Sequence, residues 1–200
     1  MPNAKELESK VRKLLEMRMS LIPYLYSAFA QYHFEGIPPF RALVVDYPND
    51  SAVYKIDDEY LIGEGLLAAP FLDGASKRKV YFPAGIWYDF NTDRKYEGGK
   101  HYEIEMSLDQ IPLFVKEGTI LPLAKPLQYI TPETVFEITC HTYGNNCKPS
   151  LLFEDNAYTL DYQKNKFNWV NLVWTGKKGS ATKKGNYAGK SYKVVSWVKH

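Results

Sequence analysis

From Gly63 onward, glycine, proline, asparagine and aspartate divide the chain into short apolar segments, and this pattern most limits the folds open to it. Strands are predicted at residues 66–71, 79–82, 87–90, 101–106 and 111–115, with a tight hairpin turn at Gly98-Gly99. Short strands at nearly regular spacing, with turn residues between them, favour an antiparallel β-sandwich.

A second β-rich module is predicted after a boundary at residues 131–133. Its strands are expected at residues 134–141, 150–154, 158–162, 167–174 and 192–199. The lysine pairs at residues 177–178 and 183–184 stand among Gly, Ser and Thr. We interpret them as part of a solvated hairpin rather than as a phosphate-binding site.

The N-terminal part of the chain has a helical pattern. Apolar side chains recur every three or four positions, which places them on one stripe of a helix: Leu7, Val11, Leu14, Leu15, Leu21, Ile22, Leu25 and Phe29. Pro23 interrupts this pattern, because its ring removes an N–H and crowds the carbonyl of Met19. We expect a kink there, or a second helix capped by Ser20, and an end at Gly36.

Residues 41–47 form a mostly continuous apolar run before the turn at residues 48–50. Such a run is typical of a parallel strand that is buried on both faces. A helix, a short loop, this strand and a further short helix at residues 51–60 fit the closing unit of a (β/α)₈ barrel. The predicted fold class is therefore mainly β, with an N-terminal helical remnant of a (β/α)₈ barrel followed by two antiparallel β-sandwich modules.

The balance of charge argues against nucleic-acid binding, because 25 basic and 23 acidic side chains leave a net charge of only +2. No apolar stretch reaches the roughly 20 residues of a membrane-spanning helix, and no signal-peptide pattern is visible. We expect no nucleic-acid or membrane partner, and a cytoplasmic location if Met1 is the true start. Cys140 and Cys147 are predicted to be free thiols, with a single hairpin disulfide as the alternative in an oxidising compartment.

Six motifs follow one another in a characteristic order. They are RMSLIPYLY at residues 18–26, GIPPFRAL at 36–43, DEYLIGEGLLAAP at 58–70, VYFPAGIWYDFNT at 80–92, IPLFVKEGTILPL at 111–123 and FEDN at 153–156. In order and spacing, the chain up to about Tyr162 resembles the region that follows the barrel in the family 31 glycoside hydrolases, the α-glucosidases and α-xylosidases. It departs from the family pattern at Ala42, where Pro is frequent, and at Glu59 and Glu64, where Gln and Asp are usual.

This resemblance implies three parts. Residues 1–64 would be the last helix-strand-helix part of the barrel, residues 65–130 a proximal sandwich, and residues 131–200 a distal sandwich whose completeness the sequence does not decide. The resemblance also implies a parent enzyme that hydrolyses terminal α-linked glucose or xylose by a retaining mechanism without a cofactor. Its catalytic carboxylates would lie on barrel strands that precede the matched region, so this chain alone is expected to hydrolyse nothing.

Acidic side chains are the first candidates for catalysis, because a retaining glycosidase places two carboxyl groups about 5–5.5 Å apart. Asp46 lies near the end of its expected strand, but pairing with Arg41 explains it better. Residues 57–59 are interpreted as a helix start or a solvated face. Residues 154–156 are interpreted as an acidic turn, because they lack the alternating ligands of a calcium loop. We assign no catalytic, cofactor-binding or metal-binding residue.

Histidines and tryptophans are the other candidates. The histidines are scattered, and none pairs with a cysteine or a carboxylate at a ligand spacing: His33, His101, His141 and His200. His33 is interpreted as a cation at a helix end. Trp87 and Tyr88 are neighbours on one expected strand, so Trp87 should face the core and Tyr88 the solvent.

Two other functions remain open. A free-standing carbohydrate-binding sandwich would need exposed rings, and burial of every tryptophan would remove its basis: Trp87, Trp169, Trp174 and Trp197. An interaction module would form a homodimer through the N-terminal helix, or fold that helix over a sheet. In the main interpretation, the partners are the missing barrel portion of the parent enzyme and its α-glucoside or α-xyloside substrate.

Overall fold

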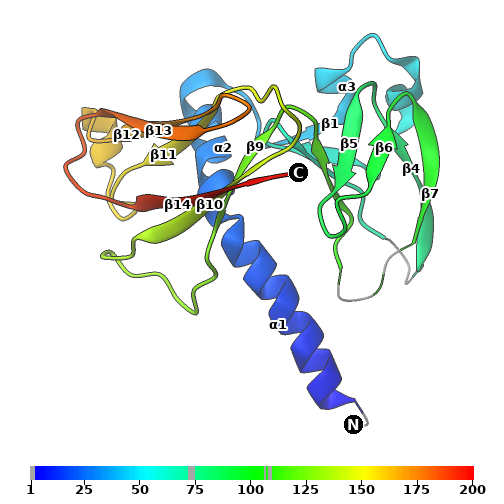
Figure 1. Cartoon of the computed structure of the whole chain (residues 1–200), viewed down its shortest axis with the longest axis horizontal. Coiled ribbons are helices and arrows are strands. Elements are labelled where there is room, and N and C mark those ends of the chain that lie inside the picture. The colour runs from blue at the N-terminus through cyan, green and yellow to red at the C-terminus, as the bar shows by residue number, and fades with distance from the viewer. Residues whose placement is uncertain (1–2, 72–74, 106, 108–109) are drawn as a thin grey trace. The chain divides into compact units, whose positions relative to one another are not determined.

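The computed structural model describes residues 3–71, 75–105, 107 and 110–200 and is mainly β (Figure 1). The chain forms two compact units. The first contains the residues up to Leu15 together with Pro38–Glu117, and the second contains Glu16–Ile37 and Gly118–His200. These units are defined by contacts rather than by sequence modules, so the expected module boundaries near residues 64 and 130 stay predictions.

The N-terminal helical pattern is divided at Leu21. The helices are α1 (Ala4–Ser20) and α2 (Ile22–Glu35). Leu21 occupies the N-cap position of α2, whereas the Ser20 hydroxyl donates to the carbonyl oxygen of Met17 at 2.7 Å, so the predicted Ser20 cap is wrong. The break near Pro23 is confirmed, and Pro23 lies in the first turn of α2, where an N–H is not needed. Gly36 ends α2 with a φ of 73°.

Short strands and two short helical segments build the rest of the first unit. They are β1 (Phe40–Ala42), α3 (Leu43–Asp46), the 3₁₀ helix η1 (Ser51–Lys55), β2 (Tyr60–Ile62), β3 (Leu66–Ala68), β4 (Lys77–Phe82), β5 (Ile86–Asp89), β6 (Lys95–Glu97), β7 (Lys100–Glu105) and β8 (Leu113–Lys116). Strands β3, β4, β5, β7 and β8 were predicted with shifted ends, and the expected last residue of the strand at 101–106 lies outside the described residues. Strands β2 and β6, with three residues each, were not predicted.

The first unit consists of a six-stranded antiparallel sheet, in the order β1-β2-β3-β8-β5-β6, and an antiparallel β4–β7 pair. One apolar core joins the two sheets and includes Leu67, Phe82, Trp87 and Phe114. Trp87 is fully buried, as predicted, but Tyr88 is only 1% exposed, so the expectation that it faces solvent is wrong. Strand β5 lies between β8 and β6, and burial of consecutive residues shows that both of its faces are covered.

The apolar run at residues 41–47 is not a single buried parallel strand. It divides into β1, which pairs antiparallel with β2, and the helical turn α3. Arg41 braces the turn between them: it is 7% exposed and donates from its guanidinium to both carboxylate oxygens of Asp46. The same side chain donates to the carbonyl oxygens of Pro38 and Gly63. The chain must turn after β1 for Asp46 to reach Arg41.

Gly98-Gly99 does not connect paired strands, although a hairpin turn was predicted there. Strand β6 pairs with β5 and strand β7 pairs with β4, so these glycines carry the chain from one sheet to the other. A Cβ atom on Gly98 would collide with the carbonyl oxygen of Pro83, and Gly99 has a φ of 81°. Glycine is therefore needed at both positions, first for a close backbone approach and then for a left-handed conformation.

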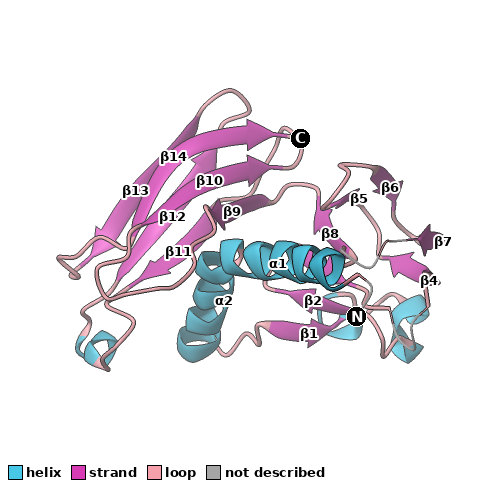
Figure 2. Cartoon of the chain, turned by 90° about the horizontal axis from the view of Figure 1, so that it is seen from below, coloured by secondary structure: helices cyan, strands magenta, loops and turns pink. Residues whose placement is uncertain are grey.

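The second unit contains α2 and two three-stranded sheets, β14-β10-β9 and β11-β12-β13. Its further elements are β9 (Ile120–Ala124), β10 (Phe136–Thr142), β11 (Ser150–Glu154), the 3₁₀ helix η2 (Asp161–Lys164), β12 (Asn168–Trp174), β13 (Gly179–Gly185) and β14 (Tyr192–Lys199). One core takes side chains from both sheets, among them Ile138, Leu152 and Leu172. Helix α2 contacts β9 and β11 (Figure 2).

Two predictions for the second unit are wrong. Strands β10 and β14 pair in parallel, so this module is not purely antiparallel. The strand expected at residues 158–162 is a turn followed by η2, because Asn156 Oδ1 accepts the backbone N–H groups of Tyr158 and Thr159. The lysine-rich segment does form a hairpin, and β13 is almost entirely exposed.

Candidate functional site

The FEDN motif joins three segments of the second unit through Glu154, which is only 1% exposed. Glu154 Oε1 accepts the backbone N–H of Ser191 at 2.7 Å, and Oε2 accepts Nδ2 of Asn168 at 2.7 Å. Lys183 Nζ lies 3.2 Å from Oε2. The sequence interpretation as an acidic turn was incomplete, because this carboxylate is a buried structural centre that ties β11 to β12, β13 and the start of β14.

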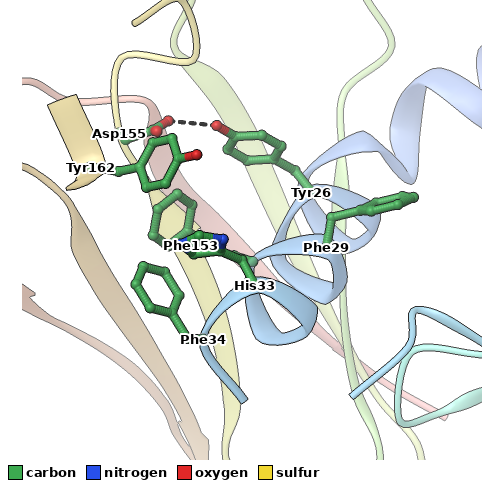
Figure 3. A pocket seen from close by; sticks show the side chains of 8 residues that line it. Tyr26, Phe29, His33, Phe34, Phe153, Asp155 and Tyr162 are labelled. Carbon is green, nitrogen blue, oxygen red and sulfur yellow. Dashed lines mark hydrogen bonds between the residues drawn. The ribbon is translucent and has the colours of Figure 1, made fainter. Parts of the chain in front are cut away.

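Asp155 faces α2 within the same unit (Figure 3). Its Oδ1 accepts the Tyr26 hydroxyl at 2.7 Å and the backbone N–H of Ala157 at 2.9 Å. Burial, followed by the hydrogen bond to Asp155, raises the pKa of Tyr26 far above its ordinary value, so this hydroxyl stays protonated and donates. The side chain of Asp155 is therefore held in one orientation.

An open pocket of about 180 Å³ lies beside this contact (Figure 3). Side chains of α2 form one wall, and the end of β11 with the segment up to η2 forms the other. The pocket is lined by Tyr26, Phe29, Ala30, His33, Phe34, Phe153, Asp155 and Tyr162. The sequence could not reveal it, because the two walls come from segments more than a hundred residues apart in the chain.

Two of the four histidines lie beside each other in the fold. His33 lies in the last turn of α2, as predicted, and its ring meets that of Tyr162 edge-on at 5.1 Å between centroids. His141 Nδ1 lies 2.8 Å from His200 Nε2, across the parallel pair of β10 and the end of β14. Among the residues that the structure describes, no three His, Cys, Asp or Glu side chains gather as metal ligands would.

The tryptophans divide into one buried ring and three partly buried rings. Trp87 is enclosed in the first unit and donates from Nε1 to the carbonyl oxygen of Pro83. Trp174 and Trp197 stack at 5.8 Å between ring centroids, and Trp169 packs against Phe153. Three of the four tryptophans are therefore only partly buried. Burial of all four would have removed the basis of the carbohydrate-binding interpretation, and the structure does not show it.

The cysteines follow the first of their two expected alternatives. Both Cys140 and Cys147 are free thiols. Burial raises the pKa of Cys140 to about 12, so this side chain is a core residue rather than a nucleophile. Separately, none of the helices in the described part of the chain has the length and apolar character needed to cross a bilayer.

The acidic candidates in the first unit also hold the structure together. Asp46 is paired with Arg41, as expected, at 2.7 Å between Nη2 and Oδ2. Asp58 pairs with Arg78 at 2.6 Å. Glu59, by contrast, is 4% exposed and lies between the end of η1 and the start of β2. Its assignment to a helix start or a solvated face is therefore wrong. It accepts the backbone N–H of Tyr81 through Oε1, while Oε2 is buried without a hydrogen-bond partner in the described part of the chain.

Burial raises the pKa of Glu59 to about 7, against 4.5 for the ordinary side chain, despite the Tyr81 N–H and the charge of Arg78. Because the folded protein holds this proton more tightly, the protonated form adds stability that is complete below pH 4.5. That stability is lost as the pH rises through 7. The buried negative charge of Glu59 therefore destabilises the folded protein above neutral pH.

We expect Glu59→Gln to raise the free energy of unfolding by about 2 kcal/mol at pH 8 and to change it little at pH 4.5. The amide keeps an acceptor for Tyr81 and removes the buried charge, while Arg78 retains Asp58. Urea denaturation at both pH values measures the difference, with Glu103→Gln on the exposed face of β7 as the control. An equal stability change at the two pH values would contradict this account.

Comparison with known proteins gives the fold a class. Residues 36–121 match the model of the glycosyl hydrolase family 31 C-terminal domain. The chain is 32% identical over 200 residues to the α-xylosidase of Saccharolobus solfataricus, covering 97% of this chain and 27% of that protein. It is 40% identical over 167 residues to neutral α-glucosidase AB of Sus scrofa, covering 79% of this chain and 17% of that protein.

A solved structure agrees with these relatives. The family 31 α-xylosidase of Xanthomonas citri superimposes with a TM-score of 0.81 at 31% sequence identity, covering 90% of this chain and 21% of that one. The fold and the matched motifs are those of a glycoside hydrolase. More particularly, the chain belongs to family 31, as a C-terminal region of such an enzyme. It spans about a quarter or less of the length of the relatives that it matches.

Proposed function

We propose that this chain is the β-rich support region of an α-glycosidase that removes terminal α-linked glucose or xylose. The observation that carries the proposal is the similarity to named α-xylosidases and α-glucosidases over most of the chain. Hydrolysis with retention needs two carboxyl groups about 5–5.5 Å apart. We place both on a (β/α)₈ barrel outside this chain, because Asp46, Asp58 and Glu154 are engaged in structural contacts.

The N-terminal helices would be the closing part of that barrel, and the β-rich remainder of the chain would brace it. Exposed apolar side chains support this arrangement. On α1, Leu7, Val11 and Leu15 are 62%, 45% and 60% exposed. An apolar stripe of this kind is normally covered by another surface. We propose that the barrel portion covers it in the whole enzyme, and that a second copy of the chain covers it when the chain is alone.

The test uses the open reading frame that contains this chain, expressed with its upstream sequence. The product of the longer frame is expected to hydrolyse 4-nitrophenyl α-glucoside or α-xyloside, and not the β-anomers. The chain alone is expected to show no turnover and to have the mass of a dimer in light scattering. Turnover by the chain alone that survives repeated purification would contradict the assignment, as would an upstream frame without a barrel.

A further inference from the structure

The pocket beside Asp155 is polar at one end and aromatic along its sides (Figure 3). At the polar end, Asp155 is 4% exposed, and Tyr26 and Ala157 occupy its Oδ1. Oδ2 makes no hydrogen bond within the described part of the chain. The Tyr162 hydroxyl and the imidazole nitrogens of His33 likewise make none with described residues. Three different polar groups therefore line the pocket with hydrogen-bonding capacity that the fold does not use.

The aromatic part of the pocket is held in place by its neighbours. Phe34 lies 4.9 Å from Phe167 and 5.8 Å from Phe153 between ring centroids. Phe34 is nevertheless 42% exposed. These rings offer flat apolar surface to a ligand. Large ligands need pockets of about 300–1,000 Å³, so the volume of about 180 Å³ suits one ring.

A pyranose ring has the matching chemistry, because its C–H face packs on aromatic rings and its hydroxyl groups exchange hydrogen bonds with carboxylate, phenol and imidazole groups. A metal ion fits less well, because the pocket supplies one carboxylate and one imidazole. An organic cation is the closest competitor, since a carboxylate beside aromatic rings also attracts positive charge. It would leave the donor hydrogens of Tyr162 and His33 without acceptors.

We propose that this pocket binds one terminal pyranose unit of an oligosaccharide, as a sugar-holding site separate from hydrolysis. In this arrangement, Asp155 and His33 contact the hydroxyl groups of the sugar while Phe34 contacts its C–H face. The choice of α-linked glucose and xylose as ligands rests on the proposed function, whereas the choice of a sugar rests on the pocket. Sugar binding to the whole chain is measured without any assay of hydrolysis. The sugar site can therefore fail this test while the proposed α-glycosidase function stands, and the reverse.

The experiment is a titration of the ¹⁵N-labelled 200-residue chain with methyl α-glucopyranoside, methyl α-xylopyranoside and maltose, followed by NMR. Amide shifts are expected to cluster at residues 29–34 and 153–162, with a dissociation constant on the order of 1–10 mM, as suits one exposed ring. Choline chloride is titrated in parallel. No saturable shifts at about 50 mM sugar, or tighter binding of choline than of any sugar, would overturn the proposal.

Two variants locate the binding. Phe34→Ala removes a ring that is 42% exposed, and His33→Ala removes an exposed imidazole, so neither substitution opens a fully buried cavity. Each is expected to weaken sugar binding at least about fivefold. Tyr129→Ala removes a ring that is 73% exposed outside the pocket and should leave the affinity unchanged. Equal affinities in all three variants would place the sugar elsewhere and overturn the site.

Discussion

Replacing Glu154 with alanine is expected to lower the free energy of unfolding by about 4 kcal/mol, because three donors lose a buried acceptor at once. Oε1 accepts the Ser191 N–H, while Oε2 accepts Asn168 Nδ2 and meets Lys183. Lys183 is 42% exposed and can turn to water, whereas Asn168 is 1% exposed and cannot. Urea denaturation followed by tryptophan fluorescence gives the difference.

The amide variant of the same residue separates charge from shape. Both oxygens of Glu154 face N–H donors, so a glutamine must place its NH₂ against a donor in either orientation. Glu154→Gln is therefore expected to cost about 2 kcal/mol despite its equal size. Glu137→Gln, on the exposed side of β10, is the matched control and should stay within about 0.5 kcal/mol. An unchanged stability for Glu154→Gln would show that the network contributes little.

Arg41→Ala is expected to lower the free energy of unfolding by about 3 kcal/mol, the second largest effect. The guanidinium binds both oxygens of Asp46 and two backbone carbonyls, and these acceptors lose their donor together. Asp46 is 33% exposed at its side chain, so water can replace part of the lost interaction. Thermal unfolding by circular dichroism, with urea denaturation for the free energy, measures the loss.

Two further variants test this explanation. Arg41→Lys keeps the charge but cannot present a planar fork to four acceptor oxygens, so it should recover less than half of the loss. Arg12→Ala breaks a pair of similar length, 2.8 Å to Glu8, whose side chains are 63% and 67% exposed. It should change the stability by less than about 0.5 kcal/mol. Equal losses for Arg12→Ala and Arg41→Ala would contradict the role given to burial.

Local patterns predicted most element types where a single segment decided the outcome, although the local turn after Asn156 was missed. The helical stripe, the break near Pro23 and the short strands of the first unit follow from spacing and turn residues. Partners distant in the sequence decided the rest. The sequence places Arg41 in an apolar run but does not show that Gly63, in a different segment, offers a carbonyl oxygen to it. The turn that forms α3 was therefore missed.

The candidate site was beyond prediction for the same reason. Glu59 stands beside two aspartates and looks solvated, yet its neighbour in the fold is the backbone of Tyr81, which buries it. His33 and Tyr162 each had an unremarkable interpretation, as a helix-end cation and a strand residue. Only the packing of α2 on β11 brings them together with Asp155. A pairing pattern across such distances needs related sequences or a structure.

The discontinuity of the second unit has a consequence for folding during synthesis. Helix α2 leaves the ribosome before the whole stretch Pro38–Glu117, yet its strand partners β9 and β11 come after that stretch. The last sheet closes only when β14 pairs with β10, and such distant contacts carry a high loop-closure cost. The first unit can therefore complete its sheets before β9 and β11, the strands that α2 packs against, have been synthesised. The exposed aromatic rings of α2 would make this interval the time at which a nascent chain is most open to chaperones or aggregation.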